Sequence, residues 1–226
     1  MARQVNPWNN YRLKYQFNGS DQINSSYSQV WQDIFVLTIL QGKHNGTYLE
    51  IGAEHPDLIN NTYLLTTQFN WTGVSIDCVE DHQKSWAQHR PDSKFILCDA
   101  LTVDYKQVLD ENYNGQKVID FLQCDIEPSV NTFTALKRIP HDEYRFRVIT
   151  FETDLYTGGQ SPWIREESRK YLSSLGYEMI VGDVLVDGDN PYEDWWVAPE
   201  LVNMEIANNI KAEALTTQYT AQLLFK

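Results

Sequence analysis

The stretch that decides the fold is Thr47-Tyr48-Leu49-Glu50-Ile51-Gly52-Ala53. It is short, rich in β-formers and closed by a glycine, which predicts a strand that ends in a tight turn. Four similar runs follow, at residues 73–77, 94–99, 118–125 and 146–152. Segments of helical length separate or follow them, at 60–69, 80–89, 101–109, 132–138 and 163–175. Such alternation predicts a mostly parallel α/β sheet with helices on both faces.

The flanking segments complete the predicted domain. Residues 28–40 have helical apolar spacing and are followed by Gly42, whereas the polar residues 1–26 predict an N-terminal arm or irregular cap. After Gly176, residues 177–184 and 195–197 predict an antiparallel pair that closes the sheet, and 201–226 predict a surface helix. We therefore expect one domain over residues 27–226.

The amino-acid composition limits the kinds of partner that we expect for this protein. The 226 residues carry 18 Lys and Arg against 31 Asp and Glu, a net charge of −13, which repels phosphate backbones. We therefore expect no nucleic acid among the partners of this protein. The sequence also lacks a signal-peptide pattern and a membrane-length apolar run, and its three cysteines cannot pair completely. These features predict a soluble, cytoplasmic protein with no membrane partner.

Each predicted parallel strand ends in or near an acid: Glu50, Asp77, Asp99, Asp125 and Glu152. Ligands of open α/β sheets bind at the carboxyl ends of the strands, so these acids predict one ligand-binding edge. Any one of them could instead form a turn or cap a helix.

The first turn indicates the kind of ligand. A dinucleotide pyrophosphate needs closely spaced glycines, but this turn has only Gly52 and is followed by the additional acid Glu54. A nicotinamide-dependent oxidoreductase is therefore a disfavoured alternative. A phosphate-free cofactor with a positive centre suits the acids better, and S-adenosylmethionine, a sulfonium with an ammonium group and a ribose diol, is such a molecule.

An ordered series of motifs carries a family resemblance. Its members are Tyr48-Leu49-Glu50-Ile51-Gly52-Ala53, Asn70-Trp71-Thr72-Gly73-Val74-Ser75-Ile76-Asp77, Cys98-Asp99-Ala100, Gln123-Cys124-Asp125-Ile126-Glu127-Pro128, Phe151-Glu152-Thr153-Asp154 and Tyr192-Glu193-Asp194-Trp195-Trp196. Over residues 27–199 the series resembles the FkbM family of S-adenosylmethionine-dependent methyltransferases.

The resemblance implies a Rossmann-like class I methyltransferase sheet of seven strands with a reversed final strand. It also implies O-methylation of a hydroxyl on a carbohydrate-like or small-molecule acceptor. By position, the cofactor would contact Glu50, Gly52 and Ala53 at its methionine part, Asp77 at its ribose, Asp99 and Ala100 at its adenine, and also Asp125.

On the acceptor side, the resemblance implies that Asp125, Glu152 and Asp154 hold a divalent cation such as Mg²⁺, with Glu127 near the substrate. Alternatively, Glu127 caps a helix and Asp154 forms a turn. Asp154 and Glu152 are the candidate catalytic bases. The family often has histidine where this chain has Thr153, so a cofactor-binding protein without transfer activity is another alternative.

A last motif is predicted to line the acceptor pocket. Glu193, Asp194 and Trp195 combine carboxylates, which bind hydroxyls, with an indole, which stacks on sugar faces. The alternative is a core aromatic pair beside a solvated acidic turn.

Overall fold

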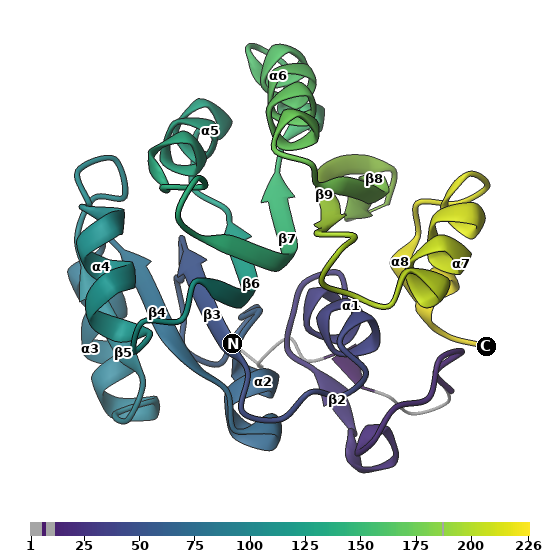
Figure 1. Ribbon diagram of the computed structural model, residues 1–226, viewed down its shortest axis with the longest axis horizontal. Helices are drawn as coiled ribbons and strands as arrows, with labels where there is room; N and C mark the ends of the chain where they lie inside the picture. The colour runs from purple at the N-terminus through teal and green to yellow at the C-terminus, as the bar shows by residue number, and fades with distance from the viewer. Residues whose placement is uncertain (1–5, 8–11, 187) are drawn as a thin grey trace.

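A seven-stranded sheet forms the centre of the computed structural model, which describes residues 6–7, 12–186 and 188–226. The strand order is β5-β4-β3-β6-β7-β9-β8 (Figure 1). Five strands are parallel, and β9 runs antiparallel to both of its neighbours. The predicted sheet with a reversed final strand is thus confirmed. The strands are β3 (Thr47–Ile51), β4 (Thr72–Asp77), β5 (Lys94–Leu97), β6 (Val118–Cys124), β7 (Arg145–Glu152), β8 (Glu178–Val186) and β9 (Asn190–Val197).

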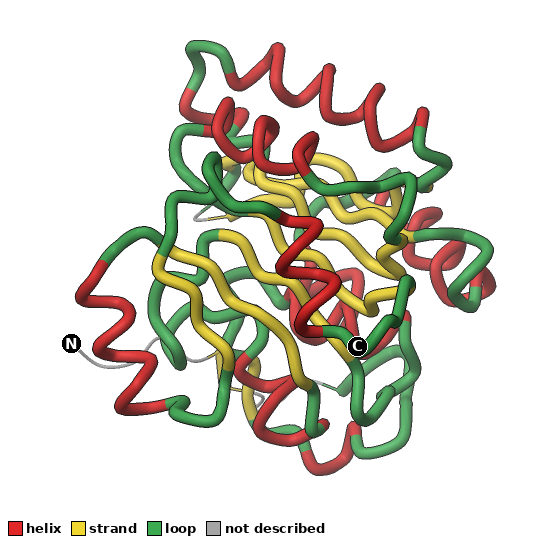
Figure 2. The backbone as a smooth tube through the Cα atoms, turned by 60° about the vertical axis from the view of Figure 1, so that its left-hand side comes forward, coloured by secondary structure: helices red, strands yellow, loops and turns green. Residues whose placement is uncertain are grey.

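The helices cover both faces of the sheet (Figure 2). One core contains residues of α1 (Gln32–Ile39), α2 (Tyr63–Phe69), α7 (Met204–Ala214) and α8 (Thr220–Leu224). The other contains residues of α4 (Tyr105–Asn112), α5 (Ser129–Arg138) and α6 (Ser161–Ser174). Because strand side chains alternate, Tyr48 enters the first core and its neighbour Leu49 the second.

Local chemistry sets two boundaries near the pocket. The segment predicted to be helical from residue 101 begins α4 only at Tyr105, because the Asp104 carboxylate caps it by accepting the Gln107 N–H at 2.9 Å. Helix α3 (Glu80–His89) follows β4 closely in the chain. Its Trp86 ring packs against the Phe95 ring of β5, with their centroids 5.3 Å apart.

The two ends of the described chain pack together. Residues 1–5 and 8–11 of the predicted arm lie outside the described residues, but β2 (Ser25–Ser26) pairs with β1 (Asn6–Pro7), and η1 (Ser20–Gln22) precedes it. Leu13 is buried and forms a β-bridge with Phe225. Residues 12–26 therefore contribute to the first core.

The C-terminal segment differs from the single surface helix predicted for it. It forms α7 and α8, which bury Ala207, Ile210, Leu223 and Leu224. Their apolar side chains cover the sheet, so these helices belong to the core. Throughout the described residues, none of the helices combines the length and apolar character that a membrane span requires.

Candidate functional site

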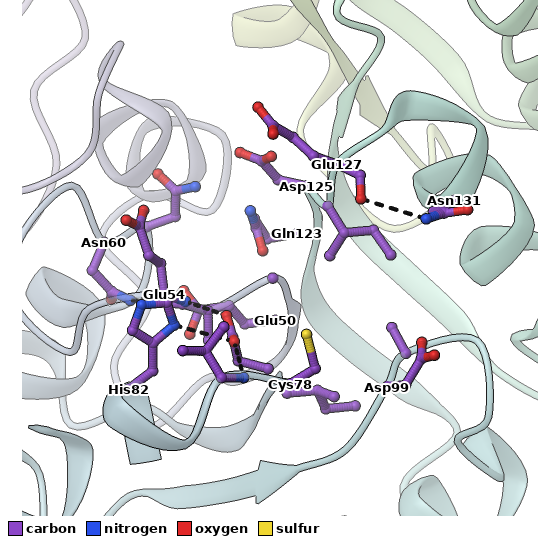
Figure 3. Close-up of a pocket in the computed structure, with 18 of the residues that line it drawn as sticks. Glu50, Glu54, Asn60, Cys78, His82, Asp99, Gln123, Asp125, Glu127 and Asn131 are labelled. Carbon is purple, nitrogen blue, oxygen red and sulfur yellow. Dashed lines mark hydrogen bonds and ion pairs between the residues drawn. The ribbon is translucent and has the colours of Figure 1, made fainter. Parts of the chain in front are cut away.

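A pocket of about 620 Å³ opens at the carboxyl ends of β3, β4, β5 and β6 (Figure 3). This is where the strand order reverses, because β4 and β6 flank β3 on opposite sides. Four of the predicted acids line the pocket: Glu50, Asp77, Asp99 and Asp125. The fifth, Glu152, lies outside the lining.

The turn after β3 forms the floor of the pocket. Gly52 has a φ of +82°, and a Cβ there would lie 1.6 Å from the Asp125 carbonyl oxygen. The N–H groups of Gly52 and Ala53 both donate to the Ile76 carbonyl, at 3.0 and 3.1 Å. Only glycine allows this conformation and this approach of the neighbouring loop.

Glu50 is held by a buried hydrogen-bond network. Its carboxylate accepts from Asn60 Nδ2 at 3.2 Å, Thr62 Oγ1 at 3.0 Å and Ser75 Oγ at 2.6 Å. Burial raises the pKa of Glu50 to about 7, although the nearby Arg90 guanidinium lowers it. Glu50 therefore lines the pocket with a carboxyl group that three protein donors already hold.

Asp77 already accepts hydrogen bonds from two backbone donors and lies beside one imidazole. Its Oδ2 accepts the Glu54 N–H at 2.9 Å, and its Oδ1 accepts the Val79 N–H at 2.9 Å and lies 3.1 Å from His82 Nδ1. A carboxylate has about four acceptor positions, so two remain for ribose hydroxyls if the His82 ring moves away from Oδ1. His82 is a side chain and can move more readily than the two backbone donors.

The predicted adenine contacts lie across the pocket from His82 (Figure 3). Asp99 is exposed and accepts the Leu101 N–H at 2.8 Å through Oδ1. Ala100 is buried, and its carbonyl accepts the Tyr105 hydroxyl at 2.9 Å.

A buried acidic group adjoins the pocket. The Tyr192 hydroxyl donates to Asp125 Oδ2 at 2.5 Å, and both residues line the pocket. Glu152 and Asp154 are buried outside the lining, and within the described residues Glu152 Oε2 and Asp154 Oδ1 have no hydrogen-bond partner. Burial, together with the neighbouring Asp125 and Asp154, raises the pKa of Glu152 above its usual range.

The carboxylate trio does not fit a magnesium ion as it stands. The two unpartnered oxygens suit a cation, and oxygen is the ligand that Mg²⁺ prefers. However, among the described residues the one group of three ligand side chains whose donor atoms all lie within 4.8 Å of one another is Glu54, His55 and His82. Asp125, Glu152 and Asp154 do not form such a group.

Only part of the predicted acceptor wall faces the pocket. Glu127 is exposed and lines it, on the same side as Asp125 (Figure 3). Glu193 is buried outside the lining and accepts the Trp195 Nε1–H at 2.6 Å.

Asp194 and Trp195 differ more strongly from that expectation, because each has a partner in the protein interior. The Asp194 carboxylate is fully buried and accepts two hydrogen bonds from Arg169, at 2.6 and 2.7 Å. The Trp195 ring stacks on Phe35 with their centroids 4.3 Å apart. Trp195 therefore agrees with the core alternative, whereas Asp194 is buried and does not form the solvated acidic turn of that alternative.

Tyr192 is a pocket residue that sequence reasoning missed. It was quoted only as part of a motif, because a tyrosine beside a strand is equally compatible with a core position. The weak signal was its place beside three acidic or aromatic residues at the start of the reversed strand.

Comparisons with known proteins bear on the fold. No family model and no curated protein matches the chain. Among solved structures, a protein from Clostridium thermocellum assigned as an rRNA methylase is similar over 77% of this chain and 99% of its own, with 12% identity and a TM-score of 0.52. A METTL16 MTase domain is similar over 74% and 66%, with 16% identity and a TM-score of 0.51. The chain has the class I methyltransferase fold.

These comparisons correct one expectation. Net charge led us to exclude nucleic acid as a partner, but a structure with this fold is assigned as an rRNA methylase. The exclusion was wrong, because a total of −13 describes the whole surface and does not determine what one pocket accepts.

Proposed function

We propose that the protein is an S-adenosylmethionine-dependent methyltransferase. One observation carries this function: carboxylates from four adjacent strand ends surround a pocket whose floor is a turn with a single glycine. Such a site suits a sulfonium cofactor with a ribose diol and offers little to a pyrophosphate. The class I methyltransferase fold is consistent with this choice.

In this site, Asp77 would accept the ribose hydroxyls, Asp99 and Ala100 would contact the adenine, and the turn at Gly52 and Ala53 would contact the methionine part. The acceptor would enter beside Asp125 and Glu127. We infer O-methylation of a carbohydrate-like or small-molecule hydroxyl from the FkbM-like order of motifs.

The reaction needs an in-line approach of the acceptor oxygen to the methyl group and the removal of one proton. The oxygen–methyl bond forms as the sulfur–methyl bond breaks, and S-adenosylhomocysteine leaves. We assign Asp154 as the base, because its Oδ1 has no partner among the described residues and burial raises its pKa above the usual value of an aspartate. Asp125 and Tyr192 line the pocket, are joined by a hydrogen bond and would orient the hydroxyl.

The deciding experiment is calorimetric titration with S-adenosylhomocysteine. Wild type should bind it, Asp77→Ala should bind at least tenfold more weakly, and Asp81→Ala, which removes an exposed acid from α3, should match wild type. No binding by wild type, or binding of a reduced nicotinamide cofactor instead, would contradict this function.

Transfer itself is tested with radiolabelled S-adenosylmethionine and a panel of glycans, small hydroxyl compounds and RNA. RNA belongs in the panel because of the fold shared with the assigned rRNA methylase. Labelled carbohydrate would support the proposed acceptor. Labelling of RNA alone would show that RNA, and not a carbohydrate, is the acceptor. Cofactor binding without transfer to any member would favour the binding-protein alternative.

Magnesium remains a prediction from the resemblance, and we assign it no step because the trio does not converge. Turnover that persists after thorough chelation would exclude a role for magnesium in the reaction. Turnover that is lost and then restored by Mg²⁺ would show that the acids close around the ion.

A further inference from the structure

A second cluster of ligand side chains lies at the rim of the pocket, opposite Asp99 (Figure 3). Glu54, His55 and His82 each offer one ligand atom, and these atoms all lie within 4.8 Å of one another. The two imidazole rings are 5.1 Å apart between centroids. We propose that these three residues bind a divalent transition-metal ion of the zinc type.

The donor set selects this class of ion. Two imidazole nitrogens and one carboxylate are a common ligand set for zinc and leave a position open for water or another ligand. Imidazole also suits nickel, copper and cobalt, whereas Mg²⁺ and Ca²⁺ prefer oxygen. The rim site is therefore chemically distinct from the all-carboxylate group at Asp125, Glu152 and Asp154.

Hydrogen bonds fix the position of the loop that contains Glu54 and His55. The Glu54 N–H donates to Asp77 Oδ2, and its carbonyl accepts the Trp86 Nε1–H, both at 2.9 Å. The Pro56 carbonyl accepts from Arg90 at 3.3 Å. These bonds fasten the loop that contains Glu54 and His55 to α3, which contains His82, so metal binding requires only small side-chain movements.

Two further details favour a ligand here. Glu54 has a φ of +44°, a strained conformation for a residue with a side chain, and such strain is often found at binding sites. His82 Nδ1 is buried without a hydrogen-bond partner among the described residues and lies 3.1 Å from Asp77 Oδ1, so a small rotation of the ring would let Nδ1–H donate to the carboxylate while Nε2 binds the metal. This carboxylate–histidine–metal arrangement fixes the ring and strengthens the ligand.

The metal would also affect the neighbouring ribose site. With His82 fixed on the metal and its Nδ1–H donating to Asp77, that carboxylate would have a third donor and less capacity to accept ribose hydroxyls. We therefore expect Zn²⁺ to weaken the binding of S-adenosylhomocysteine several-fold. This coupling rests on the proposed function, but metal binding does not.

The test is titration of the chelator-treated full chain with Zn²⁺, and with Co²⁺ followed by its visible absorption. One ion per chain should bind, and His55→Asn and His82→Asn should each weaken its affinity at least tenfold. His89→Asn, an exposed histidine on the same helix, is the matched control and should equal wild type.

Absence of a stoichiometric ion, or equal weakening by His89→Asn, would overturn the site. Circular dichroism shows whether each variant is folded. If His82→Asn does not fold, His55→Asn and the nitrogen-ligand absorption of Co²⁺ in wild type decide the question. A second titration with S-adenosylhomocysteine separates the outcomes, because metal binding without cofactor binding would contradict only the proposed function.

Discussion

The Tyr192 hydroxyl donates a 2.5 Å hydrogen bond to Asp125 at the boundary between the pocket and the buried acids. Tyr192 stands on the reversed strand β9, and Asp125 directly follows β6. This contact joins the cofactor side of the sheet to the side that holds Glu152 and Asp154.

Tyr192→Phe should lower kcat/KM for methyl transfer about tenfold, because a hydrogen bond to a charged group contributes roughly 1.5–3 kcal/mol. The affinity for S-adenosylhomocysteine should change little. Tyr219→Phe is the control, since the Tyr219 hydroxyl also donates to a carboxylate, Asp189, but at the exposed C-terminal end. Equal activities of the two variants would argue against a role for Tyr192.

Asp154→Asn should lower kcat by about 10²–10⁴-fold, the usual contribution of a general base. Glu152→Gln should have a much smaller effect, because the raised pKa of Glu152 favours its protonated form, which an amide imitates. Steady-state kinetics at saturating cofactor separates the two variants. An equal loss in both would show that the acids act as one unit and that Asp154 is not the sole base.

Gly52→Ala should unfold the pocket floor, since its Cβ would overlap the Asp125 carbonyl. Gly115→Ala is the matched control. Gly115 also has a positive φ, +78°, but a Cβ there would have no atom within 4 Å. The control should lose about 1–2 kcal/mol of unfolding free energy from the left-handed backbone alone. Urea denaturation should show a larger loss for Gly52→Ala, together with lost cofactor binding.

The pKa of Glu50 predicts how stability depends on pH. Burial raises this pKa from 4.5 to about 7, so the folded protein holds the proton more tightly than the unfolded chain does. The contribution of Glu50 to the unfolding free energy is therefore complete below about pH 4.5. It is lost as the pH rises to about 7, and the total loss is about 3 kcal/mol.

Urea denaturation between pH 4.5 and 8 checks this dependence. The difference in unfolding free energy between wild type and Glu50→Gln should fall over that interval. Asp33→Asn is the comparison, because burial raises the pKa of Asp33 only to about 6, and its effect should end at lower pH. A flat difference for Glu50→Gln would contradict the buried, proton-holding state.

The sequence predicts the sheet and the acidic side of the pocket well, because these depend on local signals. Strand-like runs, helical spacing and the single glycine at Gly52 are each readable within a few residues. The acids at 77, 99 and 125 end their strands, and parallel strands bring their carboxyl ends to one edge.

The positions of the other candidate residues depend on contacts with residues that are far away in the sequence. Asp194 resembles a pocket acid in sequence, but Arg169 on α6 neutralises it in the interior. Trp195 stacks on Phe35, which is far away in the chain. The pairing of His55 with His82 requires the loop and α3 to fold together, so spacing alone could not reveal it.

The bridge between Leu13 and Phe225 has a consequence for how the chain folds. The first core contains residues from both ends, so its closure depends on contacts of very high sequence separation, which form slowly. During synthesis, this core stays incomplete until residues 223–225 have left the ribosome. Until then, the apolar surface of α1 lacks part of its cover, and the nascent chain is at its most prone to aggregation.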